Sequence, residues 1–95
     1  MAVDSMSIIF KQFGVLEDFP AKVVIDKTPN TLKEMFDILN NGRIRDICKE
    51  ITNNGRLKND LIILKNGKTV DSATLMDTSL EDGDVIVLIV LTLGG

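Results

Sequence analysis

The sequence predicts one α+β domain in which helices pack on one face of a mixed β-sheet. Runs of β-branched and aromatic residues near both ends of the chain indicate strands, and amphipathic helical patterns lie between them. An Asn-Gly pair then marks a hairpin. The predicted order is β-β-α-(α)-β-β-β. The 95 residues, 44% of them hydrophobic, suffice for a single core and not for two.

The first two elements are predicted to form a hairpin. Residues 7–13 are rich in β-branched and aromatic side chains and stop at Gly14, as expected of a strand. A polar loop that contains Pro20 follows, and residues 21–26 then read as the partner strand.

The next segment changes to a helical period. Thr31 and Glu34 are spaced as a capping box. In this motif the Thr31 hydroxyl accepts a hydrogen bond from the Glu34 amide, and the Glu34 side chain accepts one from the Thr31 amide. A stop signal, Asn40-Asn41-Gly42, ends the pattern. One apolar stripe at helical spacing comprises Leu32, Met35, Phe36 and Leu39.

A second helical stripe comprises Ile44, Ile47, Cys48 and Ile51 and ends before Asn53-Asn54-Gly55. We interpret Cys48 as a small core residue rather than a catalytic thiol, because the chain has no His to activate it. Arg43 and Arg45 are interpreted as solvated charges of this helix rather than as an anion site.

The last part of the chain is predicted to add three strands. Residues 61–65 and 68–70 flank Asn66-Gly67, which suits a type I′ turn. Residues 73–80 read as irregular or briefly helical, and residues 81–84 as a tight turn. The final strand, 85–91, is apolar at every position.

Only one face of that final strand can meet the helices. One set of its side chains comprises Val85, Val87, Ile89 and Leu91, and the other comprises Ile86, Leu88 and Val90. The set that faces away from the helices forms either an exposed, protein-binding patch or a surface shielded by neighbouring strands. The sequence does not decide which set faces which way.

Composition argues against several classes of function. The net charge of −3 and the absence of Trp and Tyr disfavour nucleic acid as a partner. No apolar run is long enough for a transmembrane helix, and residues 1–6 lack the features of a secretion signal, so we expect a cytoplasmic protein that does not bind membranes. One Cys without His offers neither a zinc site nor a Ser-His or Cys-His site, so we expect no metal site, no bound cofactor and no self-contained hydrolase chemistry.

The candidate reactive group is the carboxylate of Gly95. Gly94 and Gly95 have no Cβ atoms, so the tail can extend through a narrow channel to another protein's reactive centre. Residues 92–95 reach about 14 Å at most. The alternative is that the two glycines are a frayed end or a cloning remnant.

Taken together, the predicted elements, the turn at residues 80–84 before the last strand and the terminal Gly94-Gly95 resemble the ubiquitin-like β-grasp sulfur-carrier family, which includes the MoaD/ThiS-like proteins and archaeal ubiquitin-like modifiers. The resemblance implies a β-grasp domain over residues 7–91, with a flexible N-terminus (1–6) and a flexible tail (92–95). The long segment 42–60 resembles the molybdopterin and modifier branches more than the thiamine carrier.

The resemblance also implies a function for the tail. An E1-like enzyme, which would use ATP and Mg, would adenylate Gly95, and sulfur transfer would give a thiocarboxylate. The protein would then be a carrier and not an enzyme, with the large subunit of molybdopterin synthase or another sulfur-acceptor enzyme as partner. Two alternatives remain, a protein modifier joined to lysines and a plain β-grasp interaction domain. Leu91-Thr92-Leu93 lacks the proline and aromatic residues often found there in molybdopterin carriers, which leaves the pathway open.

Overall fold

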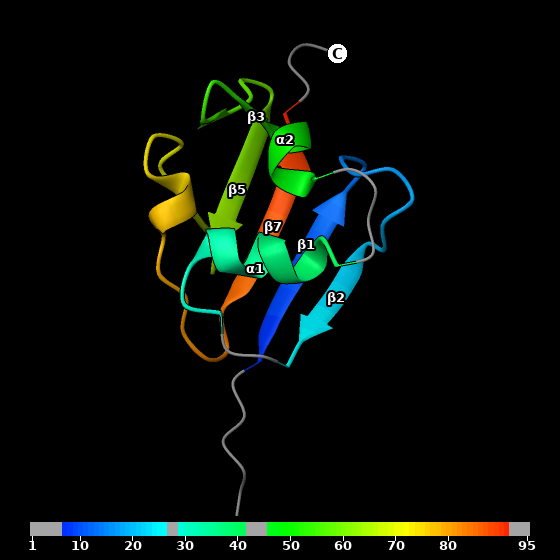
Figure 1. The fold of residues 1–95 in the computed structure, drawn as a ribbon, viewed down its shortest axis with the longest axis vertical. Helices are drawn as coiled ribbons and strands as arrows, with labels where there is room; N and C mark the ends of the chain where they lie inside the picture. Colours follow the sequence, from blue (N-terminus) through cyan, green and yellow to red (C-terminus); the bar gives the residue numbers. More distant parts are fainter. Residues whose placement is uncertain (1–6, 27–28, 42–45, 92–95) are drawn as a thin grey trace, which may run out of the picture.

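The central strand of the sheet is the last strand of the chain. The computed structural model describes residues 7–26, 29–41 and 46–91. Its main sheet has the order β2-β1-β7-β5-β6, in which β7 runs parallel to β1 and antiparallel to β5 (Figure 1). The predicted mixed sheet is therefore confirmed. The elements are β1 Ile8–Phe13, β2 Lys22–Ile25, α1 Leu32–Leu39, α2 Ile47–Ile51, β3 Thr52–Asn53, β4 Arg56–Leu57, β5 Leu61–Lys65, β6 Lys68–Thr69, the 3-10 helix Leu75–Asp77 and β7 Val85–Val90.

The core lies between the sheet and the helices, which cover one of its faces (Figure 1). Phe10 of β1 meets Phe36 of α1 edge to face, with ring centroids 5.9 Å apart. Aromatic pairs favour this geometry. All members of the predicted stripe of α1 are buried. These contacts confirm an α+β fold with helices on one face.

The capping box of α1 is confirmed on one side only. Thr31 Oγ1 accepts from the Glu34 amide at 3.3 Å, as predicted. The Glu34 side chain instead accepts from the Asn30 amide at 3.0 Å, so the predicted bond to the Thr31 amide is wrong by one residue. An isolated bridge between Thr31 and Ser79 ties the chain down just before the helix, and the amide within reach there is that of Asn30.

The second helix is short within the described residues. Asp46 is its N-cap and accepts from the Cys48 amide at 2.8 Å, while Ile47 and Ile51 are buried as predicted. The predicted members Arg43, Ile44 and Arg45 lie outside the described residues.

A small hairpin, β3–β4, follows α2 directly and was not predicted. Its turn is made by Asn54 and Gly55, with φ of 57° and 80°, which is the left-handed conformation that a type I′ turn requires. In the sequence, this pair follows a helical pattern and reads only as a helix stop. Asn66 and Gly67 make the same turn between β5 and β6, where it was predicted.

The buried polar residue Gln12 organises the connection between β1 and β2. Its Nε2 donates to the carbonyls of Leu16 at 3.1 Å and Phe19 at 2.9 Å. Its Oε1 accepts from the amides of Val15 at 3.0 Å and Leu16 at 2.9 Å. This one buried side chain binds both amides and carbonyls of the loop backbone and so fixes the loop at the end of β1.

Candidate functional site

The described chain ends at a fixed point. The Leu91 amide donates to the Asp60 carbonyl at 2.7 Å, just after Val90 pairs with Leu61 of β5. The predicted site residues Gly94 and Gly95, and the tail 92–95 as a whole, lie outside the described residues, as does the N-terminal segment 1–6. Leu91, the last described residue, is therefore held at the end of the central strand.

The two sets of side chains on β7 are now assigned. Ile86 and Leu88 are fully buried toward the helices. Val85, Val87 and Ile89 are half-buried on the opposite face, which we call the outer face of the sheet. The alternation assigned to this strand is confirmed.

The outer face is apolar across four strands. Phe13 of β1 lies beside Ile89, which in turn lies beside Ile62 of β5. Ile9 of β1 lies between Val85 and Val24 of β2. The outer side chains of β7 are half-buried because β7 lies between β1 and β5 in the centre of the sheet. Phe13 and Val24 are 55% and 58% exposed. Both predicted alternatives thus apply in part, and an apolar surface of this kind is typical of protein-binding sites.

Two lysines interrupt this surface. Lys11 and Lys22 lie directly opposite each other in the β1–β2 pair, and like charges in this position destabilise a sheet. Among the residues that the structure describes, no carboxylate lies within ion-pair distance of either ammonium. The pair therefore offers unsatisfied positive charge to a partner.

Leu91 belongs to the same set of side chains as Val85, Val87 and Ile89, is 41% exposed and extends the apolar surface. Val90 belongs to the set of Ile86 and Leu88 on the helix side and is 42% exposed there, at the end of the strand. A partner that contacts Phe13 and Ile89 would meet Leu91, the last described residue, next along the chain.

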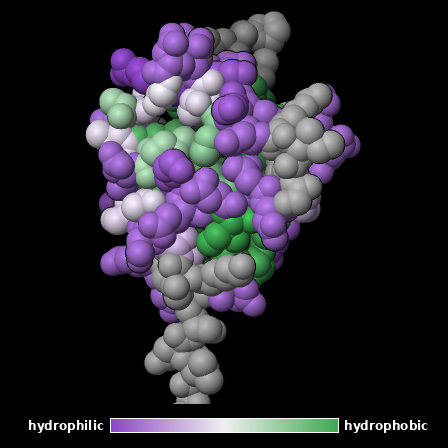
Figure 2. Space-filling view, in the orientation of Figure 1, coloured by the Kyte–Doolittle hydropathy of each residue, from purple (hydrophilic) through white to green (hydrophobic). Residues whose placement is uncertain are grey.

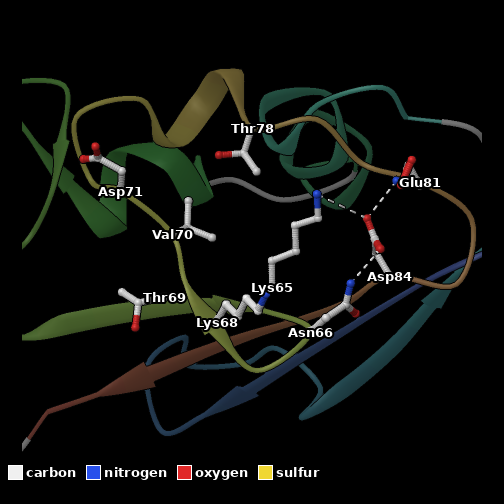
Figure 3. Close-up of a pocket in the computed structure, with 9 residues that line it drawn as sticks. All are labelled: Lys65, Asn66, Lys68, Thr69, Val70, Asp71, Thr78, Glu81 and Asp84. Atoms are coloured by element: carbon white, nitrogen blue, oxygen red, sulfur yellow. Dashed lines mark hydrogen bonds and ion pairs between the residues drawn. The ribbon is translucent and has the colours of Figure 1, made fainter.

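A polar cavity of about 520 Å³ lies at the other end of β7 (Figure 3). The buried carboxylate of Asp84 accepts from Asn66 Nδ2 at 2.8 Å and from the Glu81 amide at 2.7 Å. Lys65 Nζ lies 3.8 Å from that carboxylate and donates to the Ser79 carbonyl at 2.8 Å. These hydrogen bonds and this ion pair join the β5–β6 turn to the start of β7. We therefore interpret the polar groups of this cavity as structural rather than as a ligand site.

Cys48 lies half-buried against the core, with its Sγ 4.0 Å from Met76 Sδ. Burial, followed by the nearby carboxylate of Asp46, raises the pKa of the thiol to about 11. A thiol of this kind is protonated at neutral pH and is a poor nucleophile. The contacts favour the interpretation of Cys48 as a packing residue.

Replacing Cys48 by Ala should cost about 1 kcal/mol of unfolding free energy, as for a small truncation beside a core. In the native protein at pH 8, the thiol should react with a thiol reagent at least about tenfold more slowly than a free cysteine, because its raised pKa leaves little thiolate. Denaturant titration and labelling kinetics measure the two effects. Fast labelling together with loss of function in the Ala variant would make Cys48 a functional thiol.

Two further features can be stated for the part of the chain that the structure describes. None of its helices has the length and apolarity needed to cross a membrane. Its His, Cys, Asp and Glu side chains form no group of three or more that could hold a metal ion.

Comparisons with solved structures agree on the fold. Small archaeal modifier protein 1 of Haloferax volcanii matches with a TM-score of 0.65 and 18% identity, over 92% of this chain and 99% of that one. Urm1 of Trypanosoma brucei matches with a TM-score of 0.65 and 20% identity, over 99% and 100%. A chain from the complex of subunits 1 and 2 of the Helicobacter pylori molybdopterin-converting factor matches with a TM-score of 0.59 and 25% identity, over 95% and 100%.

No protein-family model matches the sequence, and no curated protein matches it significantly. The structural matches extend over nearly the full length of both chains, so they compare whole domains rather than a shared hairpin. The chain therefore has the ubiquitin-like β-grasp fold, in which it is similar to small archaeal modifier protein 1, to Urm1 and to a molybdopterin-converting factor chain.

Proposed function

We propose that this protein is a ubiquitin-like sulfur carrier. In this proposal an E1-like enzyme adenylates the C-terminal carboxylate of Gly95, which is then converted to a thiocarboxylate for sulfur transfer in molybdopterin biosynthesis. The large subunit of the synthase is the proposed acceptor. This chemistry requires Gly95 to be the last residue of the mature protein.

The observation that carries the proposal is the continuity of the outer face with the start of the tail. Phe13 and Ile89 form an apolar surface that leads to Leu91, and Gly94-Gly95 follow four residues or fewer beyond it. An enzyme that acts on the tail needs a surface by which to recognise the carrier, and this surface lies next to the tail's origin. The similarity to a chain of a two-subunit molybdopterin-converting factor supports the same reading.

The chemistry assigns this chain the role of substrate. A carboxylate oxygen of Gly95 attacks the α-phosphorus of ATP, and pyrophosphate leaves. Hydrosulfide, HS−, then attacks the carbonyl carbon of the acyl-adenylate, AMP leaves with the C–O bond broken, and loss of a proton gives the thiocarboxylate. ATP, Mg and any metal belong to the activating enzyme in this scheme. The glycines contribute a backbone without side chains, which can lie in a narrow channel that excludes water from the reactive acyl group.

A second candidate is a protein modifier that forms isopeptide bonds with lysines. The similarity to small archaeal modifier protein 1, over almost all of both chains, favours it specifically. Both roles require the same activated Gly95 and differ only in the nucleophile that attacks it.

Intact-mass measurement of protein purified from its native cell distinguishes the two roles. We expect a mass gain that matches replacement of one oxygen by sulfur, and trapping of this species by a thiol-selective reagent in a Cys48→Ala background. The Ala variant removes the only cysteine, so the label can report only on the C-terminus.

Abundant lysine conjugates without any sulfur gain would replace the carrier proposal by the modifier. A mature chain that continues past Gly95, or a terminus that stays a free acid beside a cognate activating enzyme, would contradict both and leave an interaction domain.

A further inference from the structure

Strand β2 forms one edge of the main sheet. On the side away from β1, it pairs with no other strand in the described part of the chain. An open edge presents a row of backbone donors and acceptors to which another strand can add. The register shows which groups are free. The Gln12 amide donates to the Ala21 carbonyl at 3.0 Å, so this pair is a hydrogen-bonded pair of the antiparallel ladder.

Hydrogen-bonded and non-hydrogen-bonded pairs alternate along an antiparallel ladder. The backbone N–H and C=O groups of Val23 and Ile25 therefore point toward β1, whereas those of Lys22 and Val24 point toward the free edge of the sheet. The side chains of Lys22 and Val24 lie on the outer face, away from the helices. Any strand that adds to β2 must pair with Lys22 and Val24.

The sequence of this edge is complementary to itself. Lys22 and Asp26 stand two residues before and two residues after Val24, and both are exposed. If a second β2 runs antiparallel to the first with the two Val24 residues opposite each other, each Lys22 lies opposite Asp26 of the second copy. This arrangement also supplies a carboxylate to the unsatisfied lysine pair of Lys11 and Lys22.

The helix side of the edge is complementary in the same register. Val23 of one copy would lie opposite Ile25 of the other, apolar against apolar. Behind them lies an apolar groove of about 310 Å³ between β2 and the end of α1, to which Phe19 and Ile38 contribute. In Figure 2, a hydrophobic patch interrupts the hydrophilic surface over the C-terminal end of β2. Pairing would remove this patch from water.

We propose that two copies of this protein associate through their β2 edges, antiparallel about Val24, to form a two-fold dimer with one continuous sheet. Backbone hydrogen bonds of Lys22 and Val24, the two Lys22–Asp26 ion pairs and the Val24–Val24 contact hold the dimer together. An isologous interface of this kind closes on itself and does not propagate into a filament.

The charges of Lys22 and Asp26 select the direction and the register of pairing between the two β2 strands. A parallel arrangement, or an antiparallel one that brings the two Lys22 residues together, would place like charges opposite each other at the edge. The interface is small, so the dimer should be weak and strongly dependent on concentration. Since β2 is two strands away from β7, the dimer leaves β7 uncovered, and the inference does not depend on the proposed function.

A charge-swap series tests the dimer. Sedimentation equilibrium at micromolar to millimolar concentration should show a monomer–dimer equilibrium for the native protein. Lys22→Glu or Asp26→Lys alone should weaken association at least about tenfold, because each places two like-charge pairs at the interface. The double variant, Lys22→Glu with Asp26→Lys, should restore association to within about threefold of the native value.

Lys68→Glu is the matched control, because Lys68 is exposed on β6, the opposite edge of the sheet, and its variant should associate like the native protein. Hydrogen exchange gives an independent readout. The Val24 amide should become protected as concentration rises, whereas that of Val23 should be protected throughout. A protein that stays monomeric at millimolar concentration, or a folded double variant that does not recover association, overturns the proposal and leaves this edge to a strand of another protein.

Discussion

Removing Gly95 should abolish adenylation. The truncated protein should give no detectable pyrophosphate exchange with its activating enzyme, because the acceptor carboxylate then sits one residue short of the reactive phosphate, a displacement of about 3.5 Å. Its melting temperature should stay close to that of the native protein, since the last described backbone contact, from the Leu91 amide to Asp60, is retained. Pyrophosphate exchange should therefore be lost while the melting temperature hardly changes.

Gly94→Leu should have the same effect for a different reason. The carboxylate stays in place, but the added side chain cannot enter a channel shaped for a bare backbone. Thr92→Ala, a change in the same segment that keeps both glycines, is the matched control and should exchange normally. Normal exchange by the truncated protein would show that the carboxylate of Gly95 is not the reactive group, and a large fall in melting temperature would show that the tail is structural.

Local signals in the sequence predicted most of the elements. The helix that begins after Thr31 and the hairpin at Asn66-Gly67 were predicted because their signals lie within a few adjacent residues. The hairpin at Asn54-Gly55 carries the same turn signal, but its strands have only two residues each and no alternating pattern to identify them. A helix stop and a hairpin turn look alike when one follows the other directly.

Non-local pairing was beyond the reach of sequence patterns. The parallel register of Ile9 with Val85 joins the two ends of the chain, and no short motif encodes it. That register decides which side chains of β7 face the helices. The sequence therefore predicted that β7 has an outer face, but it did not show which residues lie on that face. Gln12 was missed as well, because a buried amide is recognised only by the loop carbonyls and amides that it binds.

The two faces of β7 should respond differently to the same substitution. Leu88 is fully buried between the helices and the sheet. Leu88→Asn removes a large apolar side chain and buries an amide without partners, so it should cost about 3–5 kcal/mol of unfolding free energy, which is enough to unfold many small domains. Denaturant titration, or loss of the folded NMR spectrum, measures the effect.

Ile89→Asn changes the neighbouring residue, which is half-buried on the outer face beside Phe13 and Ile62. The new amide can reach water there, so the unfolding free energy should fall by only about 1–2 kcal/mol. Affinity for the activating enzyme should fall at least about tenfold, because the substitution places a polar group in the centre of the apolar surface next to the tail. Calorimetric titration with that enzyme, on variants shown to be folded, measures the loss. If Ile89→Asn binds normally, the outer face is not the recognition surface; if it unfolds the domain as fully as Leu88→Asn, that face is part of the core.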